Sequence, residues 1–181
     1  MSAMTRDELI QKIAETAILR GTFTLRSGRT SSYYIDKYLF LTEPEILAEL
    51  GEMIASRLPK ETTRLAGAEL GGVPLVSAAS LASGLPAIYI RNQRKDYGTE
   101  RNVEGRLEPG DKVVIVEDVV TTGGQCAEAA DVVRDAGAEV IRVIATVDRQ
   151  EGAQETMEHA KLDFEALFTI SDLGIDPDPG P

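Results

Sequence analysis

The sequence predicts an α/β fold, a mostly parallel twisted sheet flanked by helices. Short runs of apolar, often β-branched residues alternate with segments in which apolar residues recur at helical spacing. Such alternation is typical of a parallel sheet whose strands are joined by right-handed crossovers. The clearest strand is Val113–Val116, whose consecutive apolar residues indicate burial on both faces of the sheet.

The amino-terminal part is expected to form a helix followed by extended segments. Thr5 and Glu8 have the spacing of a capping box, and apolar residues at helical spacing continue toward Gly21. Extended segments are predicted at 23–25 and 32–39.

The rest of the chain continues the alternation of helices and strands. The charged segment 91–110 has no apolar periodicity and is interpreted as a loop. The other predicted elements are a helix at 44–57, a strand at 65–68, a helix of small residues up to 83, strands at 86–90 and 113–116, a helix at 124–137, and strands at 140–147 and 164–170.

The length of 181 residues favours a single domain, 1–181. Within it we expect a small amino-terminal hood over about 1–40 and a flexible tail at 175–181. No apolar run approaches the roughly 20 residues of a membrane helix, and no signal peptide is recognisable. The single cysteine, Cys126, allows no internal disulfide, so a cytoplasmic protein is expected. With the only histidine far along the chain, Cys126 is interpreted as a packed residue, not a nucleophile.

The net charge of −11 argues against non-specific binding of nucleic acid, which depends on a basic surface. An acidic surface of this kind is typical of proteins from a salt-rich cytoplasm, and it is also compatible with an ordinary acidic protein. A polyanionic substrate would therefore need locally concentrated positive charge, and the segment 91–106 provides it.

The most informative segment follows the strand Val113–Val116. Glu117 and Asp118 stand at its carboxyl end, where open α/β sheets bind their ligands. The next turn, Thr121–Gln125, supplies hydroxyls, glycine amides and the start of a helix, which together form a phosphate cradle. Because the two carboxylates would repel a phosphate, they suit the hydroxyls of a ribose beside it.

This segment resembles the phosphoribosyl-diphosphate (PRPP) loop of type I phosphoribosyltransferases, in which two acids and two hydrophobic residues precede Thr-x-Gly-Gly. It is neither a Walker loop nor a dinucleotide fingerprint, because no Gly-Lys-Ser/Thr and no spaced glycine triplet is present. Three further segments, 23–34, 91–98 and 147–151, resemble signatures of the orotate phosphoribosyltransferase family and occur in the family's order. The four motifs lie between Phe23 and Arg149, a range that covers most of the chain.

The resemblance implies a type I phosphoribosyltransferase fold and a pentosyltransferase activity in pyrimidine biosynthesis. The expected substrates are orotate and PRPP, and the products are orotidine 5-phosphate and diphosphate. Mg²⁺ is expected as a cofactor carried by PRPP itself, with no direct protein ligand. A homodimer is also implied, in which the loop with Lys95 acts on the partner's site; neither nucleic acid nor membrane is an expected partner.

The family motifs assign expected roles to individual residues. Lys95 and Arg91 are the catalytic candidates, because cations on the diphosphate stabilise the negative charge that grows as it leaves. Glu117 and Asp118 are expected to hold the ribose, and Thr121–Gln125 the 5-phosphate. The full expected PRPP site is Arg91, Lys95, Tyr97, Glu117, Asp118, Val119, Val120, Thr121, Thr122, Gly123, Gly124 and Gln125, and the expected orotate site is Arg26, Tyr34, Thr121 and Arg149.

Three positions depart from the family pattern. Asn92 stands where a second basic residue is usual, and Tyr97 replaces a common histidine. The segment Ala68–Gly72 lacks the lysine that many members carry in their pyrophosphate loop. These departures bear on the strength of pyrophosphate binding and less on the type of reaction.

Two other functions are compatible with the PRPP loop. A purine phosphoribosyltransferase would share it, but would not need the segments 27–29 or 148–151. A PRPP-sensing transcription regulator would share it too, but the segment before Phe23 is short for a helix-turn-helix unit and the charge is unfavourable for DNA.

Overall fold

The computed structural model describes residues 4–24, 30–91 and 102–177. The helices are α1 (Arg6–Ala17), α2 (Lys37–Leu41), α3 (Pro44–Ala55), α4 (Gly72–Ser83), α5 (Gly124–Asp135) and α6 (Ala153–His159). The strands are β1 (Ile18–Thr24), β2 (Thr30–Ile35), β3 (Arg64–Ala68), β4 (Ala87–Ile90), β5 (Val103–Glu104), β6 (Lys112–Val120), β7 (Glu139–Asp148) and β8 (Phe164–Thr169).

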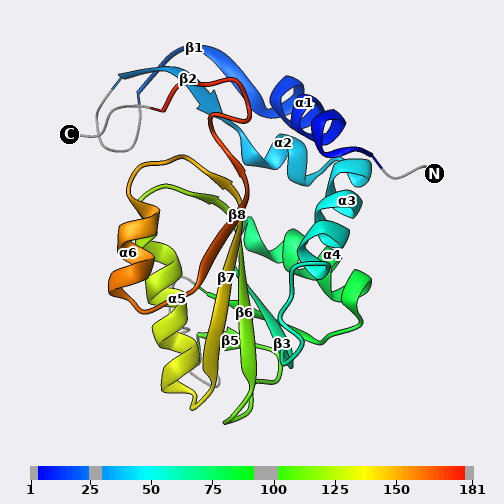
Figure 1. Cartoon of the computed structure of the whole chain (residues 1–181), viewed down its shortest axis with the longest axis vertical. Coiled ribbons are helices and arrows are strands. Elements are labelled where there is room, and N and C mark those ends of the chain that lie inside the picture. Colours follow the sequence, from blue (N-terminus) through cyan, green and yellow to red (C-terminus); the bar gives the residue numbers. More distant parts are fainter. Residues whose placement is uncertain (1–3, 25–29, 92–101, 178–181) are drawn as a thin grey trace.

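The central sheet has the strand order β5-β4-β3-β6-β7-β8. Its neighbouring strands are parallel except for β5, which pairs antiparallel with β4. In Figure 1, α3 and α4 cover one face of the sheet, and α5 and α6 cover the other. The predicted α/β class with a mostly parallel sheet is therefore confirmed.

The strand that first suggested this fold is buried on both faces. Val114 and Val116 belong to the hydrophobic cluster on the side of α1, α3 and α4. Val113 and Ile115 belong to the second cluster, on the side of α5 and α6. The two-residue period of a strand thus distributes one apolar run between two cores.

The amino-terminal hood consists of α1, the antiparallel hairpin β1–β2 and α2. The capping box is confirmed, because the Thr5 side chain accepts from the Glu8 amide and the Glu8 carboxylate accepts from the Thr5 amide. In Figure 1, β1 and β2 lie above the upper end of the sheet, which is the end where the chain leaves β8. The hood therefore lies over the carboxyl ends of the parallel strands.

Two predictions about local structure were wrong, and two short elements were missed. The first helix ends at Ala17 and not near Gly21, because Ile18 already pairs with Ile35 across the hairpin. Residues 37–39 are helical and not extended, since the Asp36 carboxylate accepts from the Tyr38 amide and caps α2. The short elements β5 and α6 were not expected.

The described residues also bear on the expected tail and on the expected absence of membrane helices. Ile175, at the start of the expected tail, is buried, and residues 178–181 lie outside the described part. Among the described helices, none has the length and apolar character that crossing a membrane requires.

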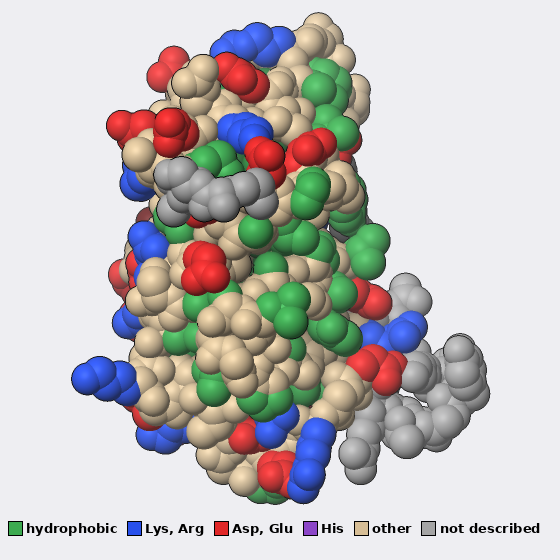
Figure 2. Space-filling model, turned by 90° about the vertical axis from the view of Figure 1, so that its right-hand side faces the viewer, with side chains coloured by type: hydrophobic (Ala, Val, Ile, Leu, Met, Phe, Trp, Pro, Cys, Tyr) green, Lys and Arg blue, Asp and Glu red, His purple; other side chains and the backbone are tan. Residues whose placement is uncertain are grey.

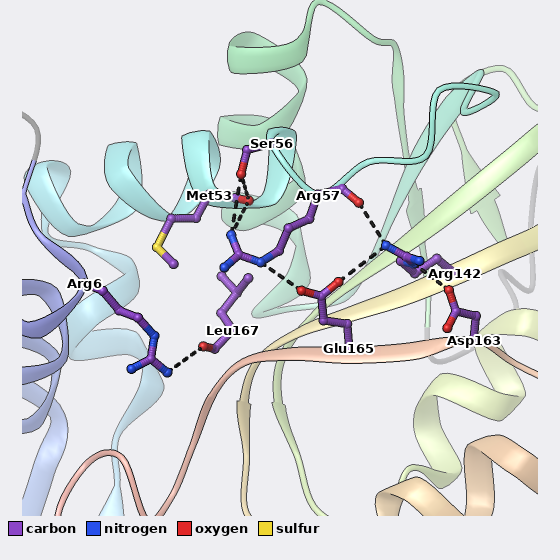
Figure 3. A network of polar contacts seen from close by, with 8 residues as sticks. All are labelled: Arg6, Met53, Ser56, Arg57, Arg142, Asp163, Glu165 and Leu167. Atoms are coloured by element: carbon purple, nitrogen blue, oxygen red, sulfur yellow. Dashed lines mark hydrogen bonds and ion pairs between the residues drawn. The ribbon is translucent and has the colours of Figure 1, made fainter.

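A polar network joins α3 to the edge of the sheet (Figure 3). The Arg57 and Arg142 guanidiniums approach different oxygens of Glu165, at 2.9 Å and 3.4 Å. Arg142 also binds Asp163 at 2.6 Å, and donates to the carbonyl of Arg57 at 3.2 Å. The Glu165 carboxylate of β8 is thereby shared between a helix end and β7.

Candidate functional site

The two predicted acids lie inside β6 and not just beyond it. Glu117 pairs in register with Ala145, and the strand continues to Val120, opposite Asp148. Both carboxylates are almost completely buried, with Glu117 4% and Asp118 1% exposed. Because successive side chains of a strand face opposite sides of the sheet, the neighbours serve different surroundings.

Glu117 faces the turn that leads into α5. Its Oε2 lies 3.8 Å from the Cys126 thiol, which confirms Cys126 as a packed residue of the core. Glu117 also lines a small hollow of about 60 Å³. The other residues around this hollow are Val119, Val120, Thr121, Thr122, Gly123, Gly124, Gln125 and Cys126.

The shape of this hollow depends on glycine. Gly123 has φ of +82°, and a Cβ there would lie 3.1 Å from Met157 of α6. The helix α5 begins at Gly124 without a side-chain cap, so the positive end of its dipole faces this turn. A concave turn at the positive end of a helix is suited to a phosphate group.

Asp118 faces the hood and the start of α4. The Lys37 ammonium lies 3.0 Å from its Oδ1 and 2.7 Å from its Oδ2. On the other side, a Cβ at Gly71 would stand only 1.5 Å from Oδ2. The carboxylate thus occupies the space that a side chain at position 71 would need.

Lys37 is a site residue that the sequence analysis missed. It is the first residue of α2, separated from β2 only by Asp36, and stands more than eighty positions before Asp118 in the chain. Asp36 could have indicated this position, because an aspartate after a strand is typical of a helix N-cap and would make Lys37 the first residue of a helix after the hood hairpin. Its approach to Asp118 depends on how the hood packs, which no local pattern reveals.

The electrostatics separate the two acids. Burial, reinforced by repulsion from Asp118, raises the pKa of Glu117 to about 8. Burial opposes the charged form of Lys37, but attraction and hydrogen bonding to Asp118 outweigh it and raise the pKa of the ammonium. Near neutral pH the site therefore combines a largely protonated Glu117 with an Asp118–Lys37 ion pair.

Arg149 and its neighbours form a second group of polar side chains, at the same end of the sheet. Arg149 donates to the Tyr33 hydroxyl at 3.2 Å, and its guanidinium carbon lies 5.4 Å from the centre of the Tyr33 ring. Its Nε is 2.9 Å from a carboxylate oxygen of Glu151. The expected ring contact, Tyr34, instead packs against Phe23 on the other face of β2 and is 46% exposed.

The remaining predicted residues divide into described and undescribed ones. Arg91, at the end of β4, lies 3.6 Å from Glu104 and borders a cavity of about 140 Å³ that Gln125 also lines. Arg91 and Gln125, the last residue of the turn Thr121–Gln125, thus border the same cavity. Arg26, Lys95 and Tyr97 lie outside the described residues, as does Asn92.

The glycine segment after β3 lies against β6. The peptide between Glu69 and Leu70 is cis. A Cβ at Gly72 would approach the Val116 carbonyl oxygen to 2.9 Å, so this segment needs glycine for close packing. It contains no lysine or arginine, and it borders Asp118 directly.

Comparisons with known proteins agree with this geometry. A family model described as a phosphoribosyl transferase domain matches residues 40–172. The chain is 46% identical to the orotate phosphoribosyltransferase of Halobacterium salinarum, over 92% of this chain and 95% of that protein. It is 48% identical to that of Haloquadratum walsbyi, over 88% of this chain and 87% of the relative.

Solved structures give the same result. The orotate phosphoribosyltransferase of Mycobacterium tuberculosis, in complex with Fe(III) dicitrate, superposes with a TM-score of 0.83 at 31% identity. That comparison covers 94% of this chain and 99% of the other. The same enzyme, solved with PRPP, superposes with a TM-score of 0.78 at 30% identity, covering 94% and 99% of the two chains.

Proposed function

Since this chain belongs to the phosphoribosyltransferase family and, within it, to the orotate phosphoribosyltransferases, we propose that it transfers the 5-phosphoribosyl group of PRPP to orotate. The products are orotidine 5-phosphate and diphosphate, a step of pyrimidine biosynthesis. The observation that carries this proposal is the pair of buried acids followed by the hollow that Thr121–Gln125 line at the start of α5.

The chemistry of transfer follows from how these groups bind PRPP. The hollow at the start of α5 receives the 5-phosphate, and the two acids bind the ribose hydroxyls. Asp118 is an acceptor, whereas a protonated Glu117 can also donate a hydrogen bond. As the bond to diphosphate breaks, Lys95 and Arg91 stabilise the charge of the leaving group.

Orotate is held at the Arg149 end of the site. A guanidinium can bind a carboxylate through two parallel hydrogen bonds, which suits the carboxylate of orotate. Glu151 and Tyr33 orient Arg149, because both contact it in the structure. Arg26, Tyr34 and Thr121 remain part of the proposed orotate site.

We propose Mg²⁺ as the cofactor, carried by PRPP oxygens. The donor set fits this arrangement: Asp118 is already paired with Lys37, and Glu117 is buried with a raised pKa. Mg²⁺ also keeps several of its waters and commonly reaches proteins through substrate phosphates. When bound, it supplies positive charge that helps diphosphate to leave.

A homodimer is the proposed working unit, and the α3–α4 face supports it. Figure 2 shows hydrophobic side chains gathered on this side of the molecule. Leu47 of α3 and Pro74 and Leu81 of α4 line a groove of about 500 Å³, and Leu81 is 87% exposed. Exposed apolar surface of this kind is typical of protein interfaces. The loop that carries Lys95 would then act on the partner's PRPP.

We also propose that the enzyme works in the cytoplasm. The support is its single cysteine, which leaves the chain without internal disulfides and accords with a reducing compartment.

The proposed activity is tested by following the absorbance of orotate. Consumption should require both PRPP and Mg²⁺, and neither hypoxanthine nor adenine should replace orotate. Arg149→Met should raise the KM for orotate about 10- to 100-fold, because a charge-assisted pair is lost, and should change the KM for PRPP much less. Arg134→Met, on the exposed face of α5, is the matched control and should behave as wild type. Folded protein that consumes no orotate over a range of salt concentrations would refute the proposal.

A further inference from the structure

We propose that Lys37 binds the diphosphate of PRPP and supplies the positive charge that the glycine segment Glu69–Gly72 lacks. This inference deepens the proposed function and rests on it. It assigns a binding residue in the hood, outside all four sequence motifs, to the leaving-group end of the site.

Lys37 lies beside both Asp118 and the glycine segment. Its ammonium contacts both oxygens of Asp118, and Oδ2 of the same carboxylate fills the space beside Gly71. Since both contacts involve one oxygen, the ammonium also lies close to the glycine segment. The Asp118 carboxylate, proposed above to bind the ribose, therefore lies next to both the glycine segment and the Lys37 ammonium.

The Lys37 side chain is partly exposed, although its partner Asp118 is buried. The Asp118 side chain is 1% exposed, whereas the Lys37 side chain is 33% exposed. A lysine ammonium has three donors, and the two oxygens of Asp118 leave at least one of them for another acceptor. Lys37 therefore remains accessible to a ligand while it is held by Asp118.

Lys37 also supplies positive charge at a place where carboxylates predominate. The Asp118 carboxylate lies against the glycine segment, which itself contains Glu69 and no basic residue, and this negative charge disfavours a polyanion. Of the described basic residues at this end of the sheet, Arg91 lies beside Glu104, and Arg149 is held by Glu151 and Tyr33. Lys37 borders the glycine segment itself, and α4 adds the positive end of its dipole there without a side-chain cap.

These steps give Lys37 a bridging role. When ribose hydroxyls bind Asp118, the ammonium can remain on one carboxylate oxygen and donate to a diphosphate oxygen as well. A compact, mobile point charge suits a phosphate whose position changes as it leaves. The effect should be confined to ligands that contain the diphosphate.

The test is calorimetric binding of PRPP, pyrophosphate and ribose 5-phosphate, each with Mg²⁺. Lys37→Met should weaken PRPP and pyrophosphate about 10- to 100-fold, the range of a lost charge-assisted contact, and ribose 5-phosphate less than about 3-fold. Lys37→Arg should retain most of the affinity for pyrophosphate. Lys12→Met, which removes a lysine paired with Glu45 on the surface, should change none of the three.

A second comparison removes the effect of leaving Asp118 unpaired. Asp118→Asn and Lys37→Met/Asp118→Asn both lack the buried carboxylate, so any difference between them in pyrophosphate affinity belongs to Lys37. We expect about a tenfold loss or more in the double variant. Equal affinities, or equal losses for ribose 5-phosphate and pyrophosphate in Lys37→Met, would reduce Lys37 to a counter-ion of Asp118. Wild-type protein that fails to bind PRPP would instead overturn the proposed function, and this inference with it.

Discussion

Glu117 and Asp118 are adjacent in β6, yet the fold gives them different neighbours. Asp118 has an ammonium within hydrogen-bond distance, whereas Glu117 faces a thiol and the apolar side of α5. A buried pair of carboxylates is costly when both are charged, and one charge compensates only one of them. The raised pKa of Glu117 is the consequence.

This difference predicts how stability depends on pH. In the native protein Glu117 keeps its proton up to about pH 8, whereas its ordinary pKa is 4.5. Between these values the native state binds more protons than the unfolded chain, so the free energy of unfolding falls as pH rises. Glu117→Gln removes this contribution. The variant should therefore gain stability relative to wild type between pH 5 and pH 8, by about 1 to 3 kcal/mol.

Urea unfolding at several pH values measures this difference. Glu128→Gln, which changes an exposed glutamate of α5, is the control and should leave the pH dependence of wild type unchanged. A Glu117→Gln curve that runs parallel to the wild-type curve would show that Glu117 is charged throughout this range.

At this scale the sequence predicted the residues of one strand and its loop, and missed their distant partners. Glu117, Asp118 and Thr121–Gln125 are consecutive, so a strand–turn–helix pattern was enough to bring them together. Lys37 and Tyr33 reach the site from the hood, across more than eighty residues of chain. Their contribution depends on tertiary packing, and the alternation of β2 then selects Tyr33 over Tyr34 as the neighbour of Arg149.

At the scale of elements, long periodic segments were predictable and short ones were not. The strands and helices around α3, α4, β6 and α5 were expected near their observed places. The strand β5 has 2 residues and α6 has 7, too few for a periodic pattern to appear. The extension of β6 through two acids depends on pairing with β7, because carboxylates alone disfavour a strand.

The network around Glu165 leads to a prediction about how these elements are joined. Glu165→Ala removes the acceptor that Arg57 and Arg142 share, and should lower the free energy of unfolding by about 1 kcal/mol at low salt. The side chains are partly exposed, so screening should reduce this loss by half or more at about 1 M salt.

Chemical unfolding at both salt concentrations gives the result as a difference between variant and wild type, in which effects of salt on the whole chain cancel. Glu139→Ala, an exposed position at the start of β7, is the matched control and should cost less than about 0.5 kcal/mol. A loss that does not respond to salt would mean that Glu165 contributes through packing and not through charge.

At the scale of the whole molecule, side chains of the hood and of the sheet meet at one candidate site. Lys37 and Tyr33 bring the hood onto the carboxyl ends of β6 and β7. The apolar groove of α3 and α4 lies on the flank of the sheet, on the same side as the glycine segment that begins α4. A second copy seated on this groove would therefore approach the leaving-group end of the site.

This arrangement predicts complementation between two inactive chains. Lys95→Ala lacks the cation of the loop, and Asp118→Asn lacks a ribose acceptor, so each homodimer should be nearly inactive. In a heterodimer with exchanged loops, one of the two sites contains both intact residues. Equal mixing with free exchange should thus restore about a quarter of wild-type activity. Introducing Leu81→Glu into both chains should abolish this recovery, because a charge then faces the apolar interface, and sedimentation should show monomers. Demonstrated exchange without recovery would mean that each chain uses its own Lys95.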